Sequence, residues 1–129
     1  SSKNVKYEFK FPEEEITVNL NESLIAWVIE NIWKNAVDAM QGVGKLTVEV
    51  SRENDVAYID VTDAGKGLPR SKFKTIFQPG YTTKTRGWGL GLSLAQRIVK
   101  EYHDGNIFVK NSEIDKGTTM RICLPISRA

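Results

Sequence analysis

The chain has 129 residues, enough for one domain, and 40% of them are apolar, enough for one buried core. Its 18 basic and 16 acidic residues nearly cancel, so the sequence lacks the broad basic field of nucleic-acid-binding proteins. Cys123 is the only cysteine, which excludes an internal disulfide and any site made of several cysteines. No apolar run approaches the roughly 20 residues that span a bilayer. We therefore expect a single soluble domain over residues 1–129, compatible with the cytoplasm.

The first third of the chain predicts two short strands and a long helix. Residues 5–11 and 16–20 read as extended segments, separated by a proline and three glutamates. Over residues 24–40 the apolar positions recur at spacings of three and four, which is typical of a helix. Asn21 or Ser23 can cap its start, and a glycine follows its end.

The middle of the chain predicts a β-hairpin and then a long loop. Apolar and polar residues alternate over 46–50 and 57–61, with a polar turn between them. The second strand continues directly into the glycine-rich segment 63–67. A short helix is expected near 73–76, and the segment 78–89, rich in glycine, threonine and lysine, has no apolar period and reads as a mobile loop.

The last third predicts one helix and two strands. Apolar residues recur with helical spacing over 90–102, and extended segments follow over 106–110 and 118–124. Because helices and strands are interspersed but neighbouring strands are joined by hairpins, we expect an α+β fold. It would be a two-layer α/β sandwich with a mixed sheet, packed on one face by the helices.

Three polar residues of the first helix form a row that could line a site. Asn31, Asn35 and Asp38 are spaced by four and three, so they project from one side, which we expect to lie opposite the apolar stripe. A carboxamide oxygen suits Mg²⁺, which also takes water and nucleotide phosphates as ligands. Asn35 could supply such an oxygen. The alternative is an ordinary solvated helix face.

Asp63 stands at the end of a predicted strand, next to Gly65 and Gly67. A carboxylate there can accept a hydrogen bond from an exocyclic amine, and the missing Cβ atoms would let a flat ring approach the backbone. The alternative is a common turn that ends a strand.

A glycine-rich segment, residues 87–92, opens the second long helix. Backbone N–H groups at a helix N-terminus favour phosphate, and Lys84 and Arg86 just before it add positive charge. The segment is neither a Walker loop nor a dinucleotide-binding fingerprint, because no Gly-Lys-Ser/Thr closes it and no strand leads into it. For the two cations, a solvated charge cluster is the alternative interpretation.

Taken in order, these segments resemble the motifs of the GHKL superfamily over essentially the whole chain. The match is closest to the ATP-binding catalytic domain of bacterial sensor histidine kinases. Residues 30–40 resemble the N box, 63–67 the first glycine box, 77–84 the F box and 87–92 the second glycine box. The resemblance implies a Bergerat-type sandwich of about five mostly antiparallel strands and about three helices, with a mobile ATP lid over 78–88.

The same resemblance implies a role for each site residue. Asp63 would hydrogen-bond the adenine amine, Asn35 would help to coordinate Mg²⁺, and Asn31 would lie by the phosphates. Catalytic roles would fall on Asn31, Asn35 and the lid cations Lys84 and Arg86. The further ATP contacts implied are Asp38, Gly65, Gly67, Phe77, Thr82, Thr83, Lys84, Gly87, Gly89, Leu90, Gly91 and Leu92.

The N box also indicates a branch of the superfamily. ATPases that resemble it carry a glutamate four residues before the N-box asparagine, and this glutamate activates water. Here that position is Asn31, whose amide cannot act as a general base, while Glu30 points elsewhere on the helix and reads as a surface charge.

This difference favours a histidine kinase domain, which donates the γ-phosphoryl group of ATP to a histidine on a separate dimerisation domain. A degenerate nucleotide switch without phosphotransfer and a clamp-type ATPase remain alternatives. The implied partners are that dimerisation domain of the same parent and a response regulator downstream, with no nucleic acid. We expect this fragment to be monomeric and the parent to be a homodimer, compatible with an inner-membrane receptor.

Two further features of the sequence bear on function. His103, the only histidine, sits at a predicted helix end, so we expect a capping or surface role and no autophosphorylation of residues 1–129 alone. Phe73, Ile76 and Phe77 could dock on the dimerisation helices or cover the nucleotide pocket.

Overall fold

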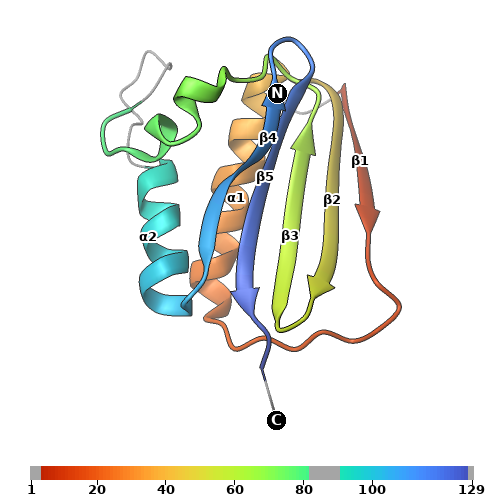
Figure 1. Ribbon diagram of the computed structural model, residues 1–129. Helices are drawn as coiled ribbons and strands as arrows, with labels where there is room; N and C mark the ends of the chain where they lie inside the picture. The colour runs from red at the N-terminus through yellow and green to blue at the C-terminus, as the bar shows by residue number, and fades with distance from the viewer. Residues whose placement is uncertain (1–3, 82–90, 128–129) are drawn as a thin grey trace.

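The computed structural model describes residues 4–81 and 91–127, and these form a two-layer α/β sandwich (Figure 1). Its five-stranded sheet has the order β1-β2-β3-β5-β4. Only β1 and β2 pair in parallel, and the other neighbours are antiparallel. The strands are β1 (Asn4–Lys10), β2 (Val43–Glu53), β3 (Val56–Asp63), β4 (Asn106–Glu113) and β5 (Gly117–Pro125).

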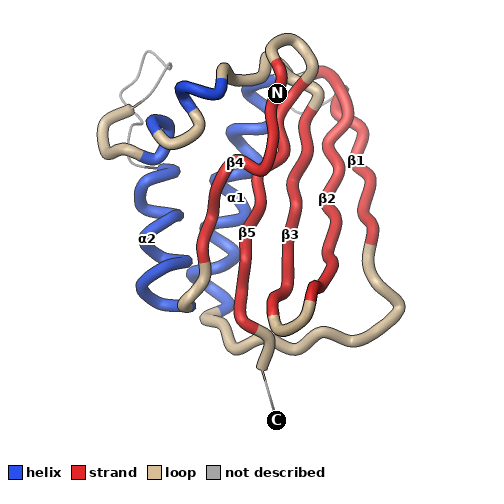
Figure 2. The backbone as a smooth tube through the Cα atoms, viewed as in Figure 1, coloured by secondary structure: helices blue, strands red, loops and turns tan. Residues whose placement is uncertain are grey.

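The helices cover one face of this sheet (Figure 2). They are α1 (Glu22–Ala39), α2 (Gly91–His103) and two short 3-10 helices, η1 (Arg70–Lys72) and η2 (Thr75–Phe77), in place of the single short helix expected near 73–76. The predicted α+β class and mixed sheet are confirmed. No helix within the described residues is long and apolar enough to cross a membrane.

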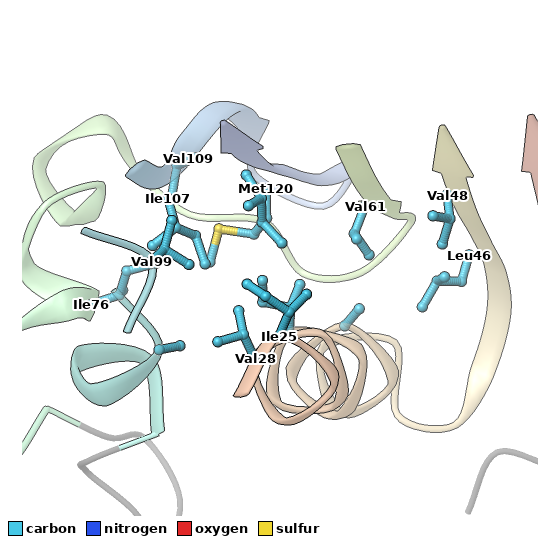
Figure 3. Close-up of a cluster of buried hydrophobic side chains, with 14 of the residues drawn as sticks. Ile25, Val28, Leu46, Val48, Val61, Ile76, Val99, Ile107, Val109 and Met120 are labelled. Carbon is cyan, nitrogen blue, oxygen red and sulfur yellow. The ribbon is translucent and has the colours of Figure 1, made fainter. Parts of the chain in front are cut away.

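The core lies between the sheet and the helices, and Figure 3 shows its side chains pointing toward one another from both layers. Apolar residues alternate along the strands and recur every three or four residues along the helices, so one face of each element is removed from water. Each buried aliphatic side chain contributes about 1.5 to 3 kcal/mol. The largest side chains with almost no exposed surface are Val28, Ile32, Leu46, Val61, Val99, Ile107 and Ile122.

The strand predicted over 16–20 is wrong. The segment makes only an isolated bridge, between Val18 and Ile126. It belongs to the connection that runs from β1 to the start of α1 across the ends of the strands (Figure 1). A segment that crosses the strand ends cannot form a continuous ladder with a neighbour, although its residue types favour extended backbone.

The start of α1 and the end of α2 are tied together by His103. Asn21 is the N-cap, because its Oδ1 accepts the N–H of Leu24 at 3.0 Å. The backbone N–H of Asn21 donates to Nε2 of His103, also at 3.0 Å. On the other side of the ring, Nδ1 donates to the carbonyl oxygen of Ile98 at 3.0 Å, since a carbonyl can only accept. His103 is therefore a buried capping residue, not a surface residue.

We predict that His103→Ala lowers the free energy of unfolding by about 1–3 kcal/mol, because it leaves the Asn21 N–H without its partner. Tyr102→Ala is the matched control, since Tyr102 is the preceding residue of α2 and its side chain is exposed. Urea unfolding of the two variants measures the difference. Equal losses of stability would contradict the role assigned to His103.

Candidate functional site

Asp63, the last residue of β3, is a buried carboxylate held by backbone N–H groups. Its side chain lies on the helix-covered face of the sheet, like that of Val61 two residues earlier. The residue is only 8% exposed. The N–H of Gly65 donates to Oδ1 at 2.8 Å, and the N–H of Thr118 on β5 also donates to the carboxylate. Burial raises the pKa of Asp63 above its ordinary 3.8, while these two hydrogen bonds act to lower it. An ionised carboxylate offers about four acceptor positions, so capacity for a ligand donor remains.

The glycines after Asp63 let three pieces of backbone approach closely. A Cβ on Gly65 would lie 2.5 Å from the carbonyl oxygen of Ala39 at the end of α1, and a Cβ on Gly67 would collide with the carbonyl of Glu113. The N–H of Lys66 donates to the same Ala39 oxygen at 3.1 Å. The approach of a flat ring to these glycines, expected from the sequence, stays a prediction. In the structure, the absence of Cβ atoms at Gly65 and Gly67 allows the end of α1 and the β4–β5 turn to approach the loop that follows Asp63. These contacts fix the loop.

The polar row of α1 borders the apolar stripe and does not lie opposite it. Asn31 and Asn35 are half-buried, and only Asp38 is exposed. The amide Nδ2 of Asn31 donates to the Trp27 carbonyl at 2.9 Å, and Nδ2 of Asn35 donates to the Asn31 carbonyl at 2.8 Å. An amide binds a cation through its oxygen, and the bonds from the two amide nitrogens to the helix backbone fix the orientation of each side chain.

One side of α1 connects the Asp63 loop with the start of α2. A Cβ on Gly91, the first residue of α2, would lie 2.9 Å from Oδ1 of Asn31. Eight residues further along α1, about 12 Å by helical rise, Ala39 contacts Gly65. The site thus has a carboxylate near one end of this row and a helix N-terminus, which attracts anions, at the other.

Some of the residues predicted to contact ATP or a partner domain lie within the described ranges, and others lie outside them. Phe77 and Ile76 are buried in the core, while Phe73 and Leu92 are half-buried and pack against it. The ATP contacts predicted for Phe77 and Leu92, and docking on a partner or covering of the pocket by Phe73 and Ile76, stay predictions. Other predicted residues lie outside the described ranges, and their roles stay predictions: Thr82, Thr83, Lys84, Arg86, Gly87, Gly89 and Leu90.

Residues of β5 that complete the site could not be predicted from the sequence. Thr118 pairs with Asp63 in the β3–β5 register, and a Cβ on Gly117 would collide with the Asp63 carbonyl. These residues are distant from Asp63 in sequence, and they stand in none of the motifs that the sequence offered. Knowledge of the β3–β5 pairing would have been needed to find them.

We predict that Gly67→Ala destabilises the domain more than Gly80→Ala does. Both residues have positive φ, +71° and +85°, so both substitutions cost about 1–2 kcal/mol of backbone strain. Only Gly67 also faces a collision, with Glu113, which adds about 1–3 kcal/mol. Thermal or urea unfolding checks this. Equal destabilisation would mean that the loop is not clamped against the β4–β5 turn.

A family comparison agrees with this geometry. Residues 20–128 match the model of the family described as histidine kinase-, DNA gyrase B- and HSP90-like ATPase. Sporulation kinase C of Bacillus subtilis is 38% identical over 95% of this chain, and sensor histidine kinase ZraS of Salmonella typhi is 36% identical over 97%. The chain spans only 28% and 27% of the lengths of these relatives.

Solved structures agree as well. The nucleotide-free catalytic domain of histidine kinase ThkA superposes with a TM-score of 0.83 at 29% identity, covering 95% of this chain and 79% of that one. The mycobacterial sensor histidine kinase MprB, at 21% identity, shares the fold with a TM-score of 0.85 over 99% of this chain and 86% of that one. The expected resemblance is confirmed: the chain belongs to the family of histidine kinase-, DNA gyrase B- and HSP90-like ATPases, as an ATP-binding domain of the sensor histidine kinase type.

Proposed function

We propose that this domain binds Mg-ATP and donates the γ-phosphoryl group to a histidine on a separate dimerisation domain of its parent protein. The observation that carries the proposal is the row on α1. It joins the buried Asp63 carboxylate, through the Gly65 loop, to the N-terminus of α2. A ligand with an amine-bearing ring at one end and phosphates at the other fits this order of groups.

Asp63 is the proposed adenine contact. Two of its acceptor positions are used by the N–H groups of Gly65 and Thr118, which fix the orientation of the carboxylate. A remaining position can accept a hydrogen bond from the exocyclic amine of adenine. Because burial excludes water from competing, such a bond discriminates strongly against a base that lacks the donor.

Asn31 and Asn35 are the proposed residues at the phosphate end. Their amide nitrogens are bonded to the α1 backbone, so the Asn35 oxygen fits a Mg²⁺ ligand and the Asn31 oxygen lies beside the start of α2. When bound, Mg²⁺ would neutralise phosphate charge. Asn31 and Asn35 would orient the phosphate end of the nucleotide, and Lys84 and Arg86 are the proposed cations of the lid.

Transfer to a protein histidine is favoured over hydrolysis. Position 31, where the related ATPases carry their base, is an asparagine. The neighbouring Glu30 forms a solvent-exposed ion pair with Lys34 at 2.9 Å, so it reads as a surface charge and not as a base aimed at the phosphates. We therefore propose that the parent is a two-component sensor kinase, with a response regulator as downstream partner.

We predict that Asp63→Asn weakens binding of a non-hydrolysable ATP analogue with Mg²⁺ by at least about tenfold, or about 1.4 kcal/mol. The amide would turn a donor toward an N–H group that the carboxylate accepts. Calorimetric titration measures the affinity, and Asp104→Asn, an exposed acid-to-amide change, is the control. Absence of binding by the wild-type domain would refute the nucleotide site.

The same preparation distinguishes the alternatives. Transfer of labelled phosphate to the histidine-bearing domain supports the kinase. ATP hydrolysis by the fragment alone would favour a clamp-type ATPase. Binding without either reaction, in the presence of that domain, would favour a degenerate switch.

A further inference from the structure

We infer that Ser112, on β4, is a positioning residue that sets the orientation of Asp63 for adenine recognition. The inference rests on the proposed function, because it concerns the same carboxylate. Ser112 does not contact Asp63 directly. Its hydroxyl joins the loop after Asp63 to the start of β5, which supplies one of the two N–H groups that hold the carboxylate.

The Ser112 hydroxyl makes three hydrogen bonds. Its Oγ accepts the N–H of Leu68 at 2.8 Å, donates to the carbonyl of Gly117 at 3.0 Å, and lies 2.7 Å from Oγ1 of Thr118. A hydroxyl has one proton and two lone pairs. Since the proton goes to Gly117, Thr118 donates to Ser112, and the hydroxyl is fully used.

These bonds act on the Asp63 loop from both sides. Leu68 immediately follows Gly67, so the bond from its N–H pins the end of the loop that begins at Asp63. Thr118 carries both the side chain bonded to Ser112 and the N–H that donates to Asp63. Loss of the hydroxyl leaves the Leu68 N–H without its partner and loosens Thr118. The Asp63 carboxylate can then still accept hydrogen bonds, but its orientation is no longer fixed.

The consequence is specific to the base of the nucleotide. Adenine presents an exocyclic amine where guanine presents a carbonyl oxygen, so a rigid Asp63 carboxylate accepts from adenine and repels guanine. A carboxylate that can rotate distinguishes the two less well. The Ser112 hydroxyl should therefore affect the preference for adenine more than the overall stability of the domain.

Three variants test this. Ser112→Ala removes the hydroxyl, and Ser112→Thr retains it. Thr119→Val is the matched control, because Thr119 Oγ1 bonds Thr62 Oγ1 at 2.8 Å across the same two strands, β3 and β5. Thr62 and Thr119 alternate with the helix-facing Val61 and Met120, so this pair lies on the other face of the sheet.

Calorimetry with Mg-ADP, and competition with GDP, give the readout, with urea unfolding in parallel. We expect ADP affinity to fall about tenfold in Ser112→Ala, with a smaller loss for GDP, so that the ratio of the two affinities falls. Ser112→Thr and Thr119→Val should bind ADP like the wild type. If Ser112→Ala does not fold, Ser112→Cys, with a weaker donor and acceptor, gives the same comparison.

The outcomes separate this inference from the proposed function. Wild-type binding of ADP together with an unchanged affinity in Ser112→Ala overturns the role of Ser112 alone. Equal losses for ADP and GDP, or an equal loss in Thr119→Val, also overturn it, because they indicate a general structural effect. Absence of ADP binding by the wild type refutes the nucleotide site itself.

Discussion

The close approach of three backbone segments determines the rest of this structure. The loop after Asp63 lies against the end of α1 at Ala39 and against the β4–β5 turn at Glu113. Both contacts are closed to any side chain with a Cβ, so glycines at 65 and 67 are a steric requirement. With the loop fixed in this way, Asp63 is buried, and the N–H groups of Gly65 and Thr118 give its carboxylate a defined direction.

Enclosure of Asp63 also explains why the site can recognise a ligand. A buried carboxylate costs free energy unless hydrogen bonds compensate it. The N–H groups of Gly65 and Thr118 compensate in part, yet burial still raises the pKa of Asp63. The folded domain therefore holds a buried carboxylate whose acceptor capacity exceeds its two backbone hydrogen bonds, at one end of a polar row on α1. A ligand that donates to Asp63 relieves this cost.

Much of the fold could be predicted from the sequence, because α1, α2 and the alternating strands each show a hydrophobic periodicity that is readable in a single chain. The strand over 16–20 failed because pairing depends on where a segment runs, not only on its residue types. Asp63 and the N-box asparagines were found because they stand in recognisable motifs. Thr118 was missed because only the β3–β5 register places it opposite Asp63, and Ser112 was missed because only the β4–β5 register places it beside Thr118. Strand register cannot be read directly from a single sequence.

The most direct test of this account is the pKa of Asp63 in the nucleotide-free domain, measured by the side-chain carboxyl shift in a pH titration by nuclear magnetic resonance. We expect a midpoint above the ordinary pKa of 3.8, because burial outweighs the two backbone hydrogen bonds. The folded domain then binds this proton more tightly than the unfolded chain. The resulting contribution to stability is complete below the ordinary pKa and is lost as pH rises through the raised one. A midpoint at or below 3.8 would contradict the claim that Asp63 is a buried carboxylate able to accept a further hydrogen bond from a ligand.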